Sequence, residues 1–148
     1  MLLVKKSSAA AEALGRSRGG FTTKLHALCD ALGNPIRFLL APGQRHDLSQ
    51  AANLLDGVEA EAVLADRGYD ANWLVAQIAE SGAEVVIPPK RNRKVKRLYD
   101  ANLYADRNKV ERLFGRLKQY RRVATRYEKT ASSYLGMVYV AGIMTLLA

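Results

Sequence analysis

The chain has 148 residues, with 23 Lys and Arg against 14 Asp and Glu, so its formal charge at pH 7 is +9. This length favours a single domain that buries about 70% of its unfolded surface. An apolar content of 49% excludes an intrinsically disordered chain. One cysteine, Cys29, excludes an internal disulfide, and with only two histidines it excludes a structural zinc site. The apolar stretch after Met1 is too short for a secretion signal, so we expect a cytoplasmic protein.

The positive charge is concentrated in one stretch. Residues 90–129 carry 15 basic and 4 acidic side chains, whereas residues 1–89 carry 8 basic and 10 acidic ones. Such clustering is typical of a surface that binds a polyanion, most often nucleic acid. One alternative is a solvated basic face that only aids solubility. Another is an anionic membrane surface, which requires an amphipathic basic helix.

The N-terminal part predicts a lead-in followed by a β-hairpin. Residues 1–19 have no hydrophobic period and are interpreted as irregular, which places the folded domain at residues 20–148. Apolar and polar residues alternate over 21–29, with His26 on the polar side, and alternate again over 36–40. The turn-forming stretch between the two runs predicts a hairpin.

Helices and strands alternate in the middle of the chain. Asp47 with Gln50 three residues later resembles a capping box, and Asp70 is expected to cap the next helix. Pro88 is expected to stop the last strand. The predicted elements are a helix over 47–55, a buried strand over 62–65, a helix from Asp70 to Gly82 with Leu74, Val75 and Ile78 on its inner face, and a strand over 85–87.

The C-terminal part predicts a basic loop and two helices. Residues 90–97 form a charge run without apolar period, which indicates an exposed loop. A long helix is expected over 102–122, with a buried stripe of Val110, Leu113, Phe114 and Leu117. Ser132 or Ser133 is expected to cap a final apolar helix over 134–147, shorter than the roughly 20 residues of a membrane span. These elements predict an α/β fold with a mixed sheet.

One face of the predicted long helix combines a carboxylate with cations. At about 100° per residue, Tyr104, Arg107, Glu111 and Lys118 lie on a single face. The simplest interpretation is an ordinary i,i+4 ion pair between Arg107 and Glu111. The alternative is that Glu111 binds Mg²⁺, because a carboxylate on a polyanion-binding surface repels the polyanion unless a cation lies between them. Asp66, at the end of a buried strand, is the matching candidate, although a turn-forming role is equally consistent.

Three stretches resemble the insertion-sequence DDE transposases, whose catalytic core has an RNase H-like fold. The resemblance covers about residues 15–147. It is carried by Tyr104-x2-Arg107-x3-Glu111-x6-Lys118, by Leu64-Ala65-Asp66-Arg67-Gly68-Tyr69 and by Gly19-Gly20-Phe21-Thr22-Thr23-Lys24-Leu25-His26.

The resemblance implies roles in DNA cleavage at the ends of an element and in joining those ends to target DNA. Asp66 and Glu111 would be two of three carboxylates that bind Mg²⁺ or Mn²⁺. Arg107 and Lys118 would grip the DNA, and Tyr104 would pack against it. The remaining basic residues expected to contact phosphates are Lys90, Arg91, Arg93, Lys94, Arg121 and Arg122.

One part of the family pattern is missing. The first catalytic aspartate belongs on a strand before the hairpin, and residues 1–19 contain no aspartate. We therefore expect an RNase H-like mixed sheet without its first strand, and a chain that is inactive or nearly so by itself. It is interpreted as a remnant or as one product of a split reading frame, completed by fusion to the upstream product. The complete protein is expected to be a homo-oligomer.

Two other functions remain open. The first is a non-catalytic DNA-binding protein that occupies transposon ends and interferes with the full enzyme. The second is another RNase H-like nuclease, such as a junction resolvase, which would make the Tyr-Arg-Glu-Lys spacing a coincidence. The enzyme-derived interpretation requires Asp66 and Glu111 to converge closely enough to share a cation.

Overall fold

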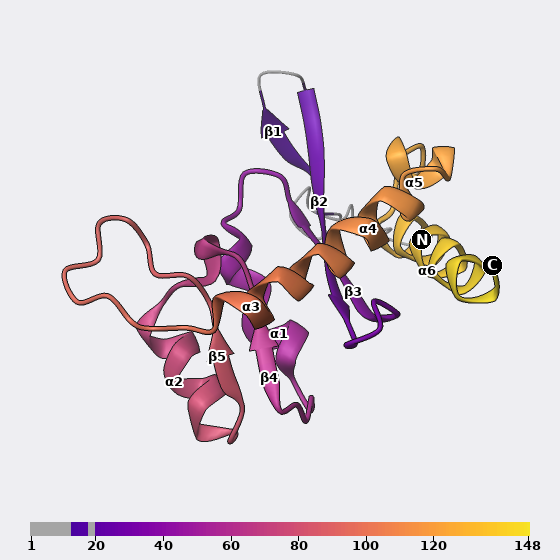
Figure 1. The fold of residues 1–148 in the computed structure, drawn as a ribbon. Coiled ribbons are helices and arrows are strands. Elements are labelled where there is room, and N and C mark those ends of the chain that lie inside the picture. The colour runs from indigo at the N-terminus through magenta and orange to yellow at the C-terminus, as the bar shows by residue number, and fades with distance from the viewer. Residues whose placement is uncertain (1–12, 18–19) are drawn as a thin grey trace.

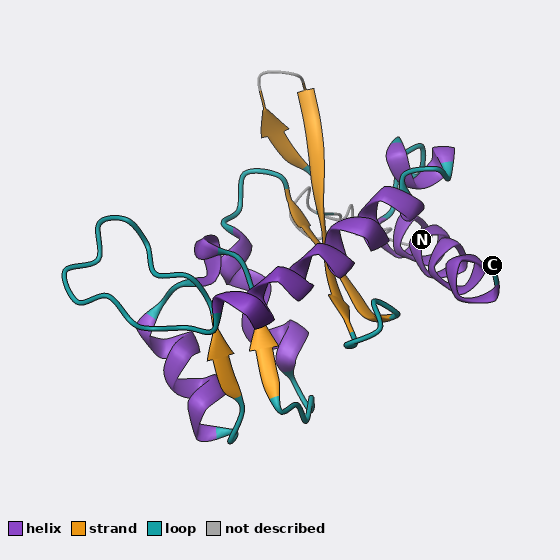
Figure 2. Ribbon diagram, viewed as in Figure 1, coloured by secondary structure: helices purple, strands orange, loops and turns teal. Residues whose placement is uncertain are grey.

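The computed structural model describes residues 13–17 and 20–148, which form an α/β fold with helices around two small sheets (Figure 2). The predicted α/β class is confirmed. The described strands form an antiparallel sheet of three strands and a parallel sheet of two, where a single mixed sheet was expected. Of the lead-in predicted to be irregular, residues 1–12 and 18–19 lie outside the described part of the chain.

The antiparallel sheet contains the predicted hairpin. Its strands, in the order in which they pair, are β1 (Gly15–Ser17), β2 (Gly20–Cys29) and β3 (Pro35–Pro42). Asp30 closes the turn by accepting two backbone N–H bonds, and Gly33 provides the positive φ of 86° that the turn requires. β1 shows that the irregular prediction was wrong at residues 15–17. This strand is held by backbone pairing with β2, and its three residues show no hydrophobic alternation from which a strand could be predicted.

The parallel sheet and its helices follow the predicted order. The elements are the 3-10 helix η1 (Asp47–Gln50), α1 (Ala51–Leu55), β4 (Ala62–Leu64), the 3-10 helix η2 (Arg67–Tyr69), α2 (Asn72–Glu80) and β5 (Glu84–Val86). The capping box predicted at Asp47 is wrong, because η1 begins after His46 without a side-chain cap. The Asp47 carboxylate instead accepts a hydrogen bond from Lys24 Nζ of β2 at 2.9 Å.

The C-terminal region is more interrupted than its sequence pattern suggests. Its elements are α3 (Ala101–Tyr104), the 3-10 helix η3 (Ala105–Arg107), α4 (Asn108–Leu117), α5 (Arg121–Ala124) and α6 (Ala131–Leu147). The long helix predicted to reach Arg122 ends at Leu117, and Val123 of α5 then packs in the core, where its carbonyl accepts the Tyr134 hydroxyl. The serine cap is also wrong, because Thr130 Oγ1 accepts the Ser133 N–H and α6 begins at Ala131.

The buried apolar side chains form two separate clusters. One joins β3, α4, α5 and α6 through Phe38, Leu113, Leu117, Val123, Tyr134, Val138 and Ala141. The other joins α1, α2 and the end of β5 through Ala51, Leu74, Ile78, Ala83 and Ile87. The helical path α3–η3–α4 crosses from the parallel sheet to the hairpin (Figure 1) and so connects the two halves.

Polar contacts tie the hairpin to α1. The Arg37 guanidinium of β3 donates through Nη1 to the carbonyls of Asn53, Leu54 and Asp56, at 2.8 to 3.0 Å. These carbonyls lie at the C-terminal end of α1, where backbone acceptors lack helical partners and a cation is favourable. Arg37 therefore stabilises α1 and fixes its position against β3.

The final helix α6 has one buried face and one exposed face. Its 17 residues include no charged side chain, and the large apolar residues of its exposed face are Tyr139, Val140, Ile143, Met144, Leu146 and Leu147. None of the described helices combines the length and the apolar character needed to cross a bilayer.

Two glycines of α6 provide a matched test of this packing. A Cβ at Gly142 would lie 2.9 Å from Cε2 of the buried Phe38 ring, whereas a Cβ at Gly136 meets nothing within 4 Å. We expect Gly142→Ala to lower the free energy of unfolding by about 1–3 kcal/mol through overpacking. Gly136→Ala should raise it by roughly 0.5–1 kcal/mol through backbone entropy. Urea denaturation followed by circular dichroism measures both, and equal effects of the same sign would contradict the α6–β3 contact.

Candidate functional site

A broad apolar groove of about 880 Å³ lies between the two sheets. Residues 24–29 of β2 line one side of it, and residues 62–65 in and after β4 line the other. Side chains from α3 and α4 line it as well. Its largest apolar residues include Leu25, Ile36, Leu54, Leu64, Leu74, Ile87, Leu103 and Phe114. The groove thus occupies the space between the two apolar clusters.

Asp66 lies two residues after the end of β4 and lines this groove. Its Oδ1 accepts the Gly68 backbone N–H at 2.7 Å and so caps η2. A Cβ at residue 68 would lie 2.8 Å from Oδ1, which explains the glycine there. The turn-forming role considered for Asp66 is therefore correct for one oxygen, and Oδ2 takes no part in that bond.

Glu111, Arg107 and Tyr104 lie on one face of the helical path, as predicted. Arg107 forms a hydrogen-bonded ion pair with Glu111, and its guanidinium carbon lies 5.8 Å from the centre of the Tyr104 ring. Glu111 lies in the first turn of α4, with its side chain 60% exposed. Lys118 is exposed at the C-terminal cap of α4. The ordinary i,i+4 pair is thus present.

The two carboxylates expected to share a cation differ in their relation to the groove. Asp66 and Arg107 line the same groove, whereas Glu111 is absent from its lining. Within the described part of the chain, no group of three or more His, Cys, Asp and Glu side chains is placed to hold a metal ion. Carboxylate oxygens are the donors that Mg²⁺ and Mn²⁺ prefer, so Asp66 and Glu111 are suitable ligands. Two carboxylates are nevertheless too few for a metal pair. Their convergence stays a prediction.

Asp70 is the buried acid of this region, with only 2% of its surface exposed. Its Oδ2 accepts the Lys90 backbone N–H and Arg93 Nε, both at 2.7 Å. Its Oδ1 accepts Arg93 Nη2 at 2.9 Å and Arg97 Nη2 at 3.1 Å. Burial alone would raise the pKa of this carboxyl, but these hydrogen bonds outweigh burial and hold the pKa at about 2. The prediction that Asp70 caps α2 is therefore wrong, and Ala71 occupies that cap.

Asp70 anchors the basic loop, defined as residues 88–99 between β5 and α3. This loop extends away from the body of the molecule (Figure 1). Arg93 also donates to Asn72 Oδ1, and Arg97 donates to the Ile87 carbonyl, so neither is a freely exposed cation. The expectation of an exposed charge run is wrong at these two arginines. The cations that the loop does expose are Arg91, Lys94 and Lys96, and Lys90 is half-buried.

The last two predicted DNA contacts lie on α5. Arg121 Nε donates to the Tyr127 hydroxyl at 2.9 Å, and Arg122 pairs with Glu128 at 3.3 Å. Both arginines remain exposed. They lie beyond the end of α4, whereas the basic loop precedes α3, so the exposed cations are distributed along both ends of the α3–η3–α4 path.

The alternation pattern wrongly placed His26 among the exposed residues. His26 lines the groove but is only 5% exposed. Its Nδ1 lies 3.5 Å from the Tyr69 hydroxyl, while its buried Nε2 has no hydrogen-bond partner within the described structure. Burial lowers the pKa of His26, the negative charge of Asp47 raises it in part, and the positive charge of Lys24 lowers it further. Burial, with Asp47 and Asp66 nearby, raises the pKa of Tyr69 to about 12.

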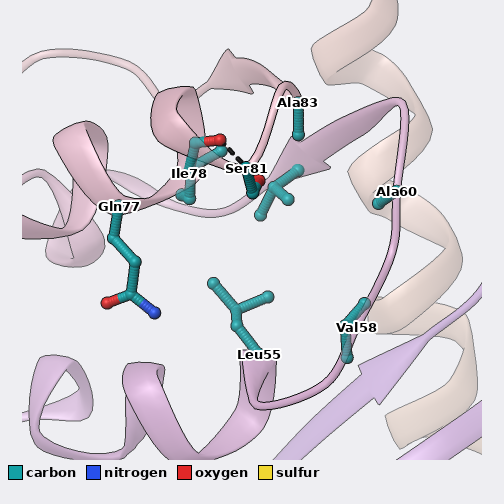
Figure 3. Close-up of a pocket in the computed structure, with 8 residues that line it drawn as sticks. Leu55, Val58, Ala60, Gln77, Ile78, Ser81 and Ala83 are labelled. Atoms are coloured by element: carbon teal, nitrogen blue, oxygen red, sulfur yellow. Dashed lines mark hydrogen bonds between the residues drawn. The ribbon is translucent and has the colours of Figure 1, made fainter.

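A second cavity is too small to act as a site. It measures about 60 Å³ and lies between α1, α2 and β4 (Figure 3). Its lining is mostly apolar, with Leu55, Val58 and Ile78 also lining the groove. The Ser81 hydroxyl already donates to the Ile78 carbonyl at 2.6 Å. The cavity has room for about two water molecules.

Comparison with known proteins gives a consistent result. The sequence profile described as "Transposase DDE domain" matches residues 5–146. A Brucella ovis protein assigned as the transposase of insertion sequence element IS6501 is 42% identical over 127 residues, which cover 83% of this chain and 96% of that protein. A Burkholderia cepacia protein assigned to element IS402 is 29% identical over 128 residues, or 78% of this chain and 57% of that protein. No solved structure matches the chain significantly.

Asp70 predicts a distinct acid dependence of stability. Because its pKa is lowered to about 2, the ionised group stabilises the fold by roughly 2–3 kcal/mol above pH 5. This contribution is lost as the pH falls from about 4 to about 2. Asp70→Asn should remove it at pH 7 and flatten the stability profile in that window, as measured by urea denaturation. Glu80→Gln at an exposed site is the control, with an expected change within about 0.5 kcal/mol.

Proposed function

Because the chain belongs to the DDE transposase family, we propose that it is the catalytic-domain portion of an insertion-sequence transposase. In this role it takes part in DNA strand cleavage at the ends of the element and in strand transfer to target DNA. The observation that carries the proposal is the placement of Asp66 at the end of β4, with Arg107 of the Tyr104–Arg107–Glu111 face lining the same groove.

We propose Asp66 and Glu111 as two carboxylates of the catalytic centre. They would hold Mg²⁺ or Mn²⁺, which in phosphoryl transfer stabilises the attacking and leaving oxygens. In the described structure, Arg107 balances the charge of Glu111 and holds its carboxylate on α4, the helix that also contributes side chains to the groove. For Glu111 to act beyond this pair, Arg107 must leave the carboxylate and bind a phosphate oxygen instead. The planar guanidinium group favours such a contact.

DNA is proposed to lie against the exposed cations along the α3–η3–α4 path. Those at its two ends are Arg91, Lys94 and Lys96 of the basic loop and Lys118, Arg121 and Arg122 near α5. The exposed ammonium and guanidinium groups of these residues can contact phosphate oxygens, and such contacts are independent of base sequence. In the cell, the protein is proposed to be cytoplasmic and to associate with the nucleoid when bound to DNA.

The chain by itself is proposed to be inactive. Two carboxylates hold a metal pair poorly, and the described residues offer no third ligand beside them. We propose that activity requires a further segment, supplied by fusion to the product of an upstream reading frame, and a homo-oligomeric assembly. The alternative function is a non-catalytic DNA-binding regulator of the full transposase, which the Arg107–Glu111 pair and the exposed cations equally support.

The basic loop gives a direct test of the DNA interface. Changing Arg91, Lys94 and Lys96 together to Gln should reduce the slope of log K against log salt concentration by about 3, because three phosphate contacts are lost. Arg93→Gln is the matched control, since its guanidinium is bound to Asp70. It should lower the free energy of unfolding and leave the salt slope nearly unchanged. Fluorescence anisotropy with a labelled 30-base-pair duplex measures the slope, and an unchanged slope in the triple variant would rule out this loop.

Glu111 separates the catalytic from the regulatory function. Glu111→Gln should leave DNA affinity unchanged or raise it, because it removes a negative charge from a basic surface. In a fusion to the upstream segment that restores strand cleavage, the same change should abolish cleavage. If Glu111 only orders Arg107, then Glu111→Gln and Arg107→Gln should weaken binding to the same degree and lower activity in proportion. Strand cleavage by the isolated chain with Mg²⁺ or Mn²⁺ would contradict the proposed inactivity.

A further inference from the structure

We propose that Tyr99, the last residue of the basic loop, is a positioning residue for the Glu111 carboxylate. It acts through two side chains that lie between them, Tyr104 and Arg107. The inference rests on the proposed function, because it concerns the same carboxylate. It goes further by assigning a role to a residue that lies before α3 and outside the face formed by Tyr104, Arg107 and Glu111.

A continuous series of contacts leads from the basic loop to α4. The rings of Tyr99 and Tyr104 meet edge to face, with their centres 5.7 Å apart and their planes at 80°. The Arg107 guanidinium carbon lies 5.8 Å from the centre of the Tyr104 ring. The same guanidinium forms the hydrogen-bonded ion pair with Glu111. Aromatic, cation–π and charge-assisted contacts each favour particular geometries, so the position of one member limits the position of the next.

The ion pair alone does not fix the Glu111 carboxylate. The Glu111 side chain is 60% exposed, and an ion pair at an exposed site holds two long side chains in one geometry only weakly. The Arg107 side chain is 26% exposed, and the Tyr104 ring is its second contact. This ring restricts the guanidinium to arrangements from which it reaches the carboxylate. The order of Glu111 therefore depends on where the Tyr104 ring lies.

The Tyr104 ring in turn needs support from outside its helix. α3 contains only four residues, and a helical segment of this length has little stability of its own. Tyr104 is its last residue and is half-buried. The contact with Tyr99 sets the orientation of the ring, because aromatic pairs favour the edge-to-face arrangement over a parallel sandwich.

Tyr99 lies between two anchored residues of the chain. Two residues before it, Arg97 donates to Asp70 Oδ1 at 3.1 Å and to the Ile87 carbonyl at 2.9 Å. Immediately after it, Asp100 caps α3 by accepting two backbone N–H bonds at 2.8 and 3.0 Å. The ring of Tyr99 therefore has a defined position from which it supports its neighbour.

The contact of Tyr99 is made by its ring, which separates positioning from simple packing. A positioning role requires an aromatic ring at residue 99, so Tyr99→Phe should preserve it. Tyr99→Leu keeps an apolar side chain without a ring, so the role should be lost. Tyr99 belongs to neither apolar cluster, so both variants are expected to fold, which circular dichroism verifies.

The Arg107 Nε–H resonance of the full chain reports on the ion pair, and Arg107→Lys assigns it. Tyr99→Leu should shift this resonance towards that of a free arginine and speed its exchange with water about two- to fivefold, as expected for the loss of an exposed cation–π contact. Tyr99→Phe should leave both unchanged. Tyr127→Leu is the matched control, because Arg121 lies 5.7 Å from the centre of that exposed ring. It should alter the Arg121 resonance and leave that of Arg107 unchanged.

Tyr104→Leu tests the path of the contacts. It should change the Arg107 resonance at least as much as Tyr99→Leu does. The double variant should have no larger effect than Tyr104→Leu alone, because both changes act through one ring. Additive effects would overturn the proposal. An unchanged Arg107 resonance in Tyr99→Leu, or equal effects of Tyr99→Leu and Tyr99→Phe, would also overturn it.

Cleavage by a fusion to the upstream segment connects the ion pair to the reaction. Tyr99→Leu should lower the cleavage rate at saturating DNA about tenfold, while DNA affinity and its salt slope stay unchanged because the loop keeps its cations. Tyr99→Phe should retain the rate. Slower cleavage with an unchanged Arg107 resonance would indicate a structural role only and contradict the proposal, as would a shifted resonance with unchanged cleavage. If Glu111→Gln retains cleavage, the proposed function fails, whereas the Arg107 resonance still decides whether Tyr99 orders the ion pair.

Discussion

The division of the apolar core into two clusters is the constraint on which the rest of the structure depends. Neither cluster reaches across the groove, so the halves are connected by the α3–η3–α4 path and by a few polar contacts such as those of Arg37 and Lys24. The same helical path carries Arg107 and Glu111. Arg107 and Glu111 therefore lie on the segment that joins the two halves.

The buried Asp70 explains how a highly basic segment acquires a defined shape. Its carboxylate binds Arg93, Arg97 and a backbone N–H of the basic loop, so part of the positive charge has a structural role. The neighbouring cations Arg91 and Lys94 are left exposed. A count of Lys and Arg thus overstates the charge available to a polyanion, and the correct count depends on which side chains fold back to the acid.

Local sequence patterns predicted the local structure of this chain. The predictions that were wrong concern side chains whose partners lie far away in the sequence. The hairpin, β4, α2 and β5 are confirmed because hydrophobic alternation, turn residues and short apolar runs encode them within a few residues. Asp70 was assigned to a helix cap because its true partners lie 20 to 27 residues away. His26 was placed on the exposed side because Tyr69, whose hydroxyl contacts its ring, belongs to another element. Residues 104–111 were grouped correctly by helical geometry, but the approach of Asp66 to Glu111 depends on tertiary structure that periodicity does not contain.

The exposed apolar face of α6 affects the colloidal behaviour of the protein. The helix has no charged residue, whereas the chain carries a net charge of +9, so mutual repulsion between copies comes from other parts of the surface. That repulsion acts over a Debye length of about 10 Å at 0.1 M salt and shortens as salt is added. Raising the ionic strength therefore has two opposite effects on this molecule. It releases bound polyanions, and it permits the exposed α6 faces of two copies, which include Val140 and Ile143, to approach one another.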